Sequence, residues 1–114
     1  MVNQTQRRKH HRIKARWPLT LLTDRGAIIG ETINITAYGI FIHCEGALPL
    51  KEIFRMSIIP PNHKAIDVTG KVIWSNFYAL DDEKTALGMG ICFVKISADD
   101  RHFLIDIVSA YPEE

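Results

Sequence analysis

The sequence predicts a mainly β protein, a six-stranded antiparallel barrel with a C-terminal α-helix. Six short segments of alternating apolar and polar residues are separated by turn residues, which is typical of small barrels. One segment near the C-terminus has the apolar spacing of a helix instead. A chain of 114 residues is long enough for one domain. Its 46% hydrophobic and 24% charged residues are typical of a soluble globular protein.

The predicted strands follow the period of two that places alternate side chains on opposite faces of a sheet. In chain order they are residues 19–23, 27–33, 40–42, 53–59, 66–74 and 86–96. The Asp24-Arg25-Gly26 turn joins the first two strands as a hairpin. Gly70 predicts a bulge or bend, and Gly88 and Gly90 predict a barrel corner or a close approach of backbone or ligand. Residues 76–85 form a polar segment that predicts a loop with an acidic tip.

The predicted helix covers about residues 97–111, with Ser97 as its N-cap. Asp99 and Asp100 would lie in the first turn, where negative charge suits the helix dipole. Pro112 would end the helix. The apolar residues at helical spacing are Phe103, Leu104, Ile107, Val108 and Tyr111. We expect this face to cover one opening or side of the barrel.

Residues 1–16 are predicted to be a flexible basic arm, with the folded domain spanning 17–114. The arm carries six of the fourteen Lys and Arg residues and none of the thirteen Asp and Glu residues. Arg8 and Arg12 are separated by three residues, and so are Arg12 and Arg16. A guanidinium group pairs bidentately with phosphate oxygens or with the N7 and O6 atoms of guanine. The arm therefore indicates either a phosphate and guanine clamp or a solvated basic tail.

The segment from Asn34 to Gly39 is predicted to be a tight connection between the second and third strands. Asn34 and Thr36 are two residues apart, so in extended backbone they point to one face. Gly39 would take positive φ without strain or let a ligand or the arm approach the backbone. The alternative is an ordinary turn that its own Asn and Thr side chains stabilise.

Four segments together resemble the PilZ domain family. RRKHHRI resembles its arginine segment, and NITAYGIFI resembles its second motif and the strand that follows. GKVIW at residues 70–74 and LGMGICFVKIS at 87–97 resemble its later strands. The resemblance implies a six-stranded barrel with a C-terminal helix. It also implies a non-enzymatic receptor that binds cyclic di-GMP, a bacterial second messenger with two guanines and two phosphates.

The resemblance also assigns the site residues. Arg8 and Arg12 match the RxxxR pair, although Arg12 and Arg16 fit the spacing as well, and Arg7 matches the arginine that precedes the pair. Asn34, Thr36 and Gly39 match the second motif, where the family often has Asp and Ser in place of Asn34 and Thr36. The implied roles are arginine forks on guanine and phosphate, with Asn34 and Thr36 holding a guanine edge.

No catalytic set, metal site or cofactor is predicted, because no spacing of His, Cys or carboxylates fits one. Cys44 and Cys92 are expected to be buried free thiols. Trp74 is expected to be a core or half-buried strand residue, with base stacking as the alternative. Neither a signal peptide nor a membrane span is apparent, so a cytoplasmic location without membrane insertion is expected.

Two further functions remain open. One is a PilZ-like interaction module that does not bind cyclic di-GMP, and the other is a small nucleic-acid binder. The acidic balance outside the arm counts against the second, so we expect no DNA or RNA partner. A receptor without an output domain on the same chain would act on a separate effector protein, which the sequence does not identify.

Overall fold

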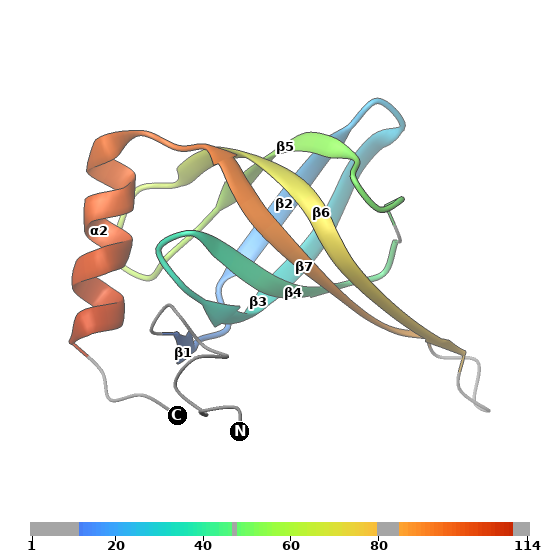
Figure 1. Ribbon diagram of the computed structural model, residues 1–114, viewed down its shortest axis with the longest axis horizontal. Helices are drawn as coiled ribbons and strands as arrows, with labels where there is room; N and C mark the ends of the chain where they lie inside the picture. Colours follow the sequence, from blue (N-terminus) through green and yellow to red (C-terminus); the bar gives the residue numbers. More distant parts are fainter. Residues whose placement is uncertain (1–11, 47, 80–84, 111–114) are drawn as a thin grey trace, which may run out of the picture.

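The computed structural model describes residues 12–46, 48–79 and 85–110 of the chain. Six strands close into an antiparallel barrel in the order β3-β2-β5-β6-β7-β4, and β4 pairs back with β3 (Figure 1). This confirms the predicted barrel. The strands are β2 (Pro18–Thr23), β3 (Gly26–Ile35), β4 (Gly39–Cys44), β5 (Ile53–Ile58), β6 (Ile66–Ala79) and β7 (Thr85–Lys95).

A short strand, β1 (Ile13–Lys14), was not expected from the sequence. It pairs with the last residues of β3, Ile35 and Asn34, beyond the point where β2 stops pairing with that edge. The Ile13 side chain is buried in the barrel core. Ile13 and Lys14, which fall within the predicted arm of residues 1–16, are thus part of the sheet. The predicted flexibility of residues 1–11 lies outside the described residues.

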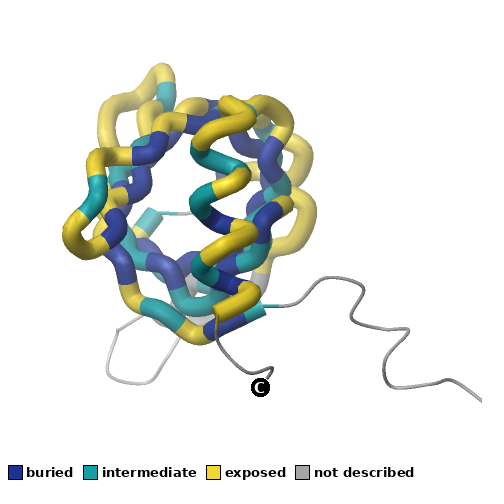
Figure 2. The backbone as a smooth tube through the Cα atoms, turned by 90° about the vertical axis from the view of Figure 1, so that its left-hand side faces the viewer, coloured by how far each residue is buried: buried dark blue, intermediate teal, exposed yellow. Residues whose placement is uncertain are grey.

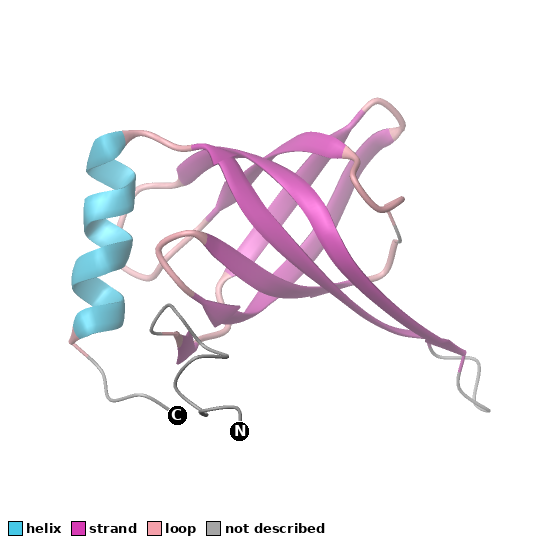
Figure 3. Ribbon diagram, in the orientation of Figure 1, coloured by secondary structure: helices cyan, strands magenta, loops and turns pink. Residues whose placement is uncertain are grey.

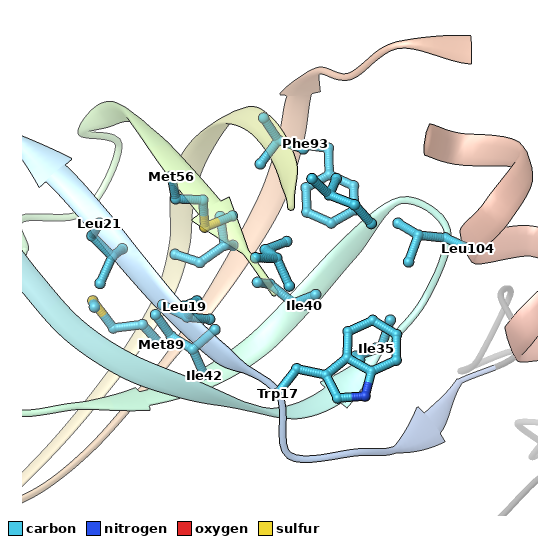
Figure 4. Close-up of a cluster of buried hydrophobic side chains, with 14 of the residues drawn as sticks. Trp17, Leu19, Leu21, Ile35, Ile40, Ile42, Met56, Met89, Phe93 and Leu104 are labelled. Carbon is cyan, nitrogen blue, oxygen red and sulfur yellow. The ribbon is translucent and has the colours of Figure 1, made fainter. Parts of the chain in front are cut away.

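Helix α2 (Ala98–Ser109) lies across one end of the barrel, as Figures 1 and 2 show together. The Ser97 side chain caps it by accepting a hydrogen bond from the backbone nitrogen of Asp100. Leu104 and Val108 are its buried residues, and Figure 4 shows Leu104 pointing toward the core. The helix thus closes the apolar interior at this end, as predicted.

The hairpin of β6 and β7 is longer than the sequence predicts. Pairing continues from Asn76 opposite Gly88 to Ala79 opposite Thr85, so the ribbon extends past the barrel (Figure 3). The expectation that residues 76–79 form a loop is therefore wrong. A two-stranded ladder needs only backbone hydrogen bonds, so the pairing can continue beyond the barrel core that sets the apolar period. The irregularity predicted at Gly70 is confirmed by a register shift between Thr69 and Gly70.

Candidate ligand-binding site

A bulge in β3 decides which side chains of this strand face outward. The pairing of β3 with β4 shifts between Thr32 and Asn34, so Thr32 lies opposite Ile42 and Asn34 lies opposite Phe41. Thr32 and Ile42 are fully buried, whereas Asn34 and Phe41 are half-buried on the outer face. Without the bulge, Thr32 and Asn34 would share one face. The bulge therefore brings Asn34 out toward the turn that follows.

Asn34, Thr36 and Gly39 line one depression on the outer face, together with Arg12 from the segment before β1. Its volume is about 540 Å³, which lies in the usual range for small-molecule sites. None of the described residues that line it is acidic. The other lining residues are Tyr38, Ile40, Phe41, Ile73, Gly90, Ile91, Cys92, Phe93 and Arg101. The structure thus brings four of the six predicted site residues together, while Arg7 and Arg8 lie outside the described residues.

Thr36 organises the turn between β3 and β4. Its hydroxyl oxygen accepts hydrogen bonds from the backbone nitrogens of Tyr38 and Gly39, both at 3.0 Å. The hydroxyl donates to the carbonyl oxygen of Gly39 at 3.1 Å. A hydroxyl has one donor and two acceptor positions, so all three are used within the turn. Asn34, in contrast, makes no hydrogen bond through its carboxamide to the rest of the described chain.

Gly39 is required by close packing and not by its backbone conformation. Among the described glycines, Gly26 is the one with positive φ, so the expectation of positive φ at Gly39 is wrong. A Cβ atom at Gly39 would lie 2.4 Å from the carbonyl oxygen of Ile91 in β7. The glycine therefore allows β4 to approach β7, where Gly39 pairs with Cys92. Among the described residues, the group that approaches Gly39 closely is therefore the backbone of β7, and not a ligand or the N-terminal arm.

The buried hydroxyl of Thr32 fixes the path of the chain that carries Arg12. It accepts a hydrogen bond from the backbone nitrogen of Trp17 at 2.8 Å and donates to the carbonyl oxygen of Ala15. The backbone nitrogen of Ala15 also donates to the carbonyl oxygen of Ile33 at 3.2 Å. The segment between β1 and β2 is therefore held on β3 at several points.

Arg12 and Arg16 leave this segment in different surroundings. Arg12 is half-buried and lines the depression. Arg16 is largely exposed, and its Nη1 atom lies 3.4 Å from Oε2 of Glu31. Such an exposed ion pair contributes little to stability. Of these two arginines, only Arg12 lines the depression.

Phe41, which lines the depression, forms an aromatic pair with Trp74 on the outer face of β4 and β6. The ring centroids of Phe41 and Trp74 are 5.3 Å apart, with the rings tilted by 48°. Both residues lie opposite Gly90 of β7, and the Phe41 ring also covers Gly88. The space at these glycines is therefore filled by side chains, and not by the backbone or ligand expected from the sequence. Trp74 is 45% exposed, so it does not belong to the core.

Arg101 of α2 contacts the turn at the rim of the depression. Its guanidinium carbon lies 4.8 Å from the centroid of the Tyr38 ring, in a cation–π contact. The carbonyl oxygen of Tyr38 accepts a hydrogen bond from the backbone nitrogen of Phe93, which fixes the turn on β7. The helix and the β3–β4 turn therefore meet at this site.

The two cysteines differ in their surroundings. Cys44 is buried, and burial raises the pKa of its thiol. Cys92 is half-buried and lines the depression, so the expectation that both thiols are buried is wrong for Cys92. In the described residues, no group of three or more His, Cys, Asp and Glu side chains could hold a metal ion. No described helix is both long and apolar enough to span a membrane.

The family model of the PilZ domain matches residues 6–110. The chain belongs to the PilZ domain family. No curated protein matches the sequence of this PilZ domain. The family match includes Arg12 and the β3–β4 turn, and both line the depression.

Solved structures share the fold of this PilZ domain at low sequence identity. The inhibitor of motility MotI/DgrA of Bacillus subtilis is 20% identical, with a TM-score of 0.76 over 92% of this chain and 51% of that one. The PilZ domain of YcgR from Escherichia coli, solved with c-di-GMP, is 14% identical, with a TM-score of 0.72 over 92% and 91%. The K. pneumonia MrkH–c-di-GMP complex is 13% identical, with a TM-score of 0.77 over 96% and 52%. The chain therefore spans about half of MotI/DgrA and MrkH.

Three residues that shape this PilZ domain site were not predicted from the sequence: Thr32 behind the depression, and Tyr38 and Arg101 on its lining. Thr32 would have been found only if the bulge after it had been predicted. Tyr38 lies inside the recognised motif, but the motif pattern leaves its position unspecified. Arg101 lies on the helix, and its contact with Tyr38 depends on how the helix docks on the barrel.

Proposed function

We propose that this protein is a non-enzymatic receptor for cyclic di-GMP that acts as an adaptor for another protein. The observation that carries the proposal is the common depression of Arg12, Asn34, Thr36 and Gly39 in a PilZ fold. Two structural neighbours, YcgR and MrkH, were solved with c-di-GMP. The proposal requires no catalytic residue, metal ion or further cofactor.

The residues would have different roles in ligand binding, according to their surroundings. Arg8 and Arg12, with Arg7 before them, would pair with the phosphates and guanines of the ligand. The carboxamide of Asn34 would bind a guanine edge, because it has no competing hydrogen bond in the described chain. Thr36 and Gly39 would act by shaping the turn, since the Thr36 hydroxyl is already occupied there. The apolar wall at Phe41 would contact a base face.

The position of Arg12 supports Arg8 and Arg12 as the RxxxR pair. Arg12 lines the depression, whereas Arg16 lies beside Glu31. Ile13 is buried directly after Arg12 and anchors this end of the arm. The buried side chain would therefore hold Arg12 at the site while residues before it close over the ligand.

The output of the receptor would be a changed surface on the barrel. Binding would draw the arm onto the outer face near β4 and α2, and this surface would act on a separate effector protein. We propose a cytoplasmic location in a bacterium, because that is where cyclic di-GMP is produced. No DNA or RNA partner is proposed, since the depression holds only two arginines among its described lining residues.

Isothermal titration calorimetry with cyclic di-GMP tests the function. We expect a dissociation constant of about 1–10 μM, or about −8 to −7 kcal/mol, because ordering the arm opposes binding. Arg12→Ala should abolish most of the heat, whereas Arg16→Ala, which removes the same charge, should bind like the wild type. No heat from the wild type at about 100 μM ligand would contradict the proposal, and the titration also gives the stoichiometry.

The alternative is a PilZ-like interaction module that does not bind cyclic di-GMP. The use of the Thr36 hydroxyl within its own turn favours it, as does the neutral Asn34 where the family often has Asp. This alternative predicts silent calorimetry together with a partner that binds equally well with and without cyclic di-GMP.

A further inference from the structure

Two arginines, Arg12 and Arg101, are among the described residues that line the depression, and Arg101 comes from the helix instead of the arginine segment. It is half-buried, and its guanidinium lies over the Tyr38 ring. Arg12 and Arg101 belong to segments at opposite ends of the chain that line the same depression. None of the motifs recognised in the sequence includes Arg101.

The helix holds Arg101 in a fixed position. The backbone nitrogen of Arg101 donates to the carbonyl oxygen of Ser97 at 3.0 Å. Leu104, three residues later and thus on the same helix face, is buried against the core. The backbone of α2 is therefore anchored on both sides of Arg101, and a change at this position is confined to its side chain.

The contact that now holds the guanidinium is weak. Tyr38 is 43% exposed, and a cation–π contact at an exposed ring is weaker than a guanidinium–phosphate pair. The acidic residues of the first helical turn, Asp99 and Asp100, do not line the depression. A phosphate group placed there would therefore compete successfully with the tyrosine ring for Arg101.

We propose that Arg101 is a ligand-binding residue that leaves Tyr38 and pairs with a phosphate of the bound cyclic dinucleotide. This inference rests on the proposed function. Because Arg101 is part of α2, the helix becomes one wall of the occupied site. The bound ligand would then contact the helix that closes the end of the barrel.

Calorimetry with cyclic di-GMP on four proteins tests this role. Arg101→Gln keeps a residue of similar helix propensity but removes the charge, and it should weaken binding about tenfold or more. Arg101→Lys keeps a point charge for the phosphate and should stay within about threefold of the wild type. Arg25→Gln is the matched control, because Arg25 lies in the exposed turn between β2 and β3, away from α2 (Figure 1). It should leave the affinity unchanged.

A second measurement follows the side chain itself. In NMR spectra of the wild type, the Nε–H signal of Arg101 and the ring signals of Tyr38 should shift together as cyclic di-GMP is added. If the wild type binds and Arg101→Gln binds equally well, the role of Arg101 is overturned while the receptor function stands. If the wild type shows no binding, the receptor function and this inference both fail.

Discussion

Asn34 lies directly opposite Phe41 on the outer face of the barrel. This pairing depends on the bulge between Thr32 and Asn34, because a regular strand would place Asn34 on the same face as the buried Thr32. The bulge thus exposes a carboxamide beside an aromatic ring and next to the turn that Thr36 organises. A hydrogen-bonding carboxamide and an aromatic ring thus lie next to each other in the depression.

The carboxamide of Asn34 should limit the affinity for guanine. Asn34→Asp is expected to tighten cyclic di-GMP binding about three- to tenfold, because a carboxylate accepts stronger hydrogen bonds from guanine N–H groups. Asn34→Ala should weaken binding about tenfold. Calorimetry on both variants measures the two changes. Equal affinities for the wild type and Asn34→Ala would show that Asn34 does not contact the ligand.

The buried hydroxyl of Thr32 should contribute strongly to stability. Thr32→Val leaves the backbone nitrogen of Trp17 and the carbonyl of Ala15 without their partner, and the free energy of unfolding should fall by about 2–4 kcal/mol. Urea denaturation measures it. Thr32→Ser should recover most of the loss. The control Thr20→Val, on the outer face of β2, should change stability by less than about 0.5 kcal/mol. A similar loss in both valine variants would contradict the role of the hydroxyl.

The glycine at position 39 should be needed even without ligand. In Gly39→Ala the new methyl group meets the carbonyl oxygen of Ile91, so the protein should lose about 2 kcal/mol or more of unfolding free energy. Gly46→Ala is a fair comparison, because its new methyl would meet only the end of the Ile28 side chain at 3.1 Å. We expect its loss to be below about 1 kcal/mol. Thermal unfolding of the unliganded variants should reveal this difference, and an unchanged Gly39→Ala would refute the packing argument.

The thiol of Cys92 should report ligand binding. With a thiol reagent at pH 8, Cys92 should react faster than Cys44, which is buried and whose pKa is raised by burial. Cyclic di-GMP should slow the modification of Cys92, because this residue lines the depression, and should leave the rate at Cys44 unchanged. Mass spectrometry of the labelled peptides separates the two rates. Equal rates at Cys92 with and without saturating ligand would place the ligand elsewhere.

The positions of the six barrel strands and the helix could be predicted from the sequence, because buried residues recur with a regular period in most of them. Leu19, Leu21, Ile40 and Ile42 alternate with less buried neighbours, and all four lie in the core. Leu104 and Val108 likewise define the buried helix face. Strand β1 could not be found in this way, because two residues among basic neighbours show no period.

The parts of the site formed by residues close in sequence were predictable. The parts formed by packing between distant segments were not. The two-residue spacing of Asn34 and Thr36 predicted that their side chains lie on one face. In the structure both residues line the depression, together with Arg12. The bulge that buries Thr32 and the contact of Arg101 with Tyr38 arise from pairing and packing between distant segments. Such contacts leave no periodic pattern in the sequence.

Amide chemical shifts during a titration with cyclic di-GMP show where the ligand binds. Binding at the depression predicts saturable shifts at Arg12, Asn34 and Tyr38, which line it, with unchanged signals at Asp24 and Arg25 in the β2–β3 turn. An unchanged spectrum at saturating ligand, or shifts that cluster at the β2–β3 turn instead, would contradict it.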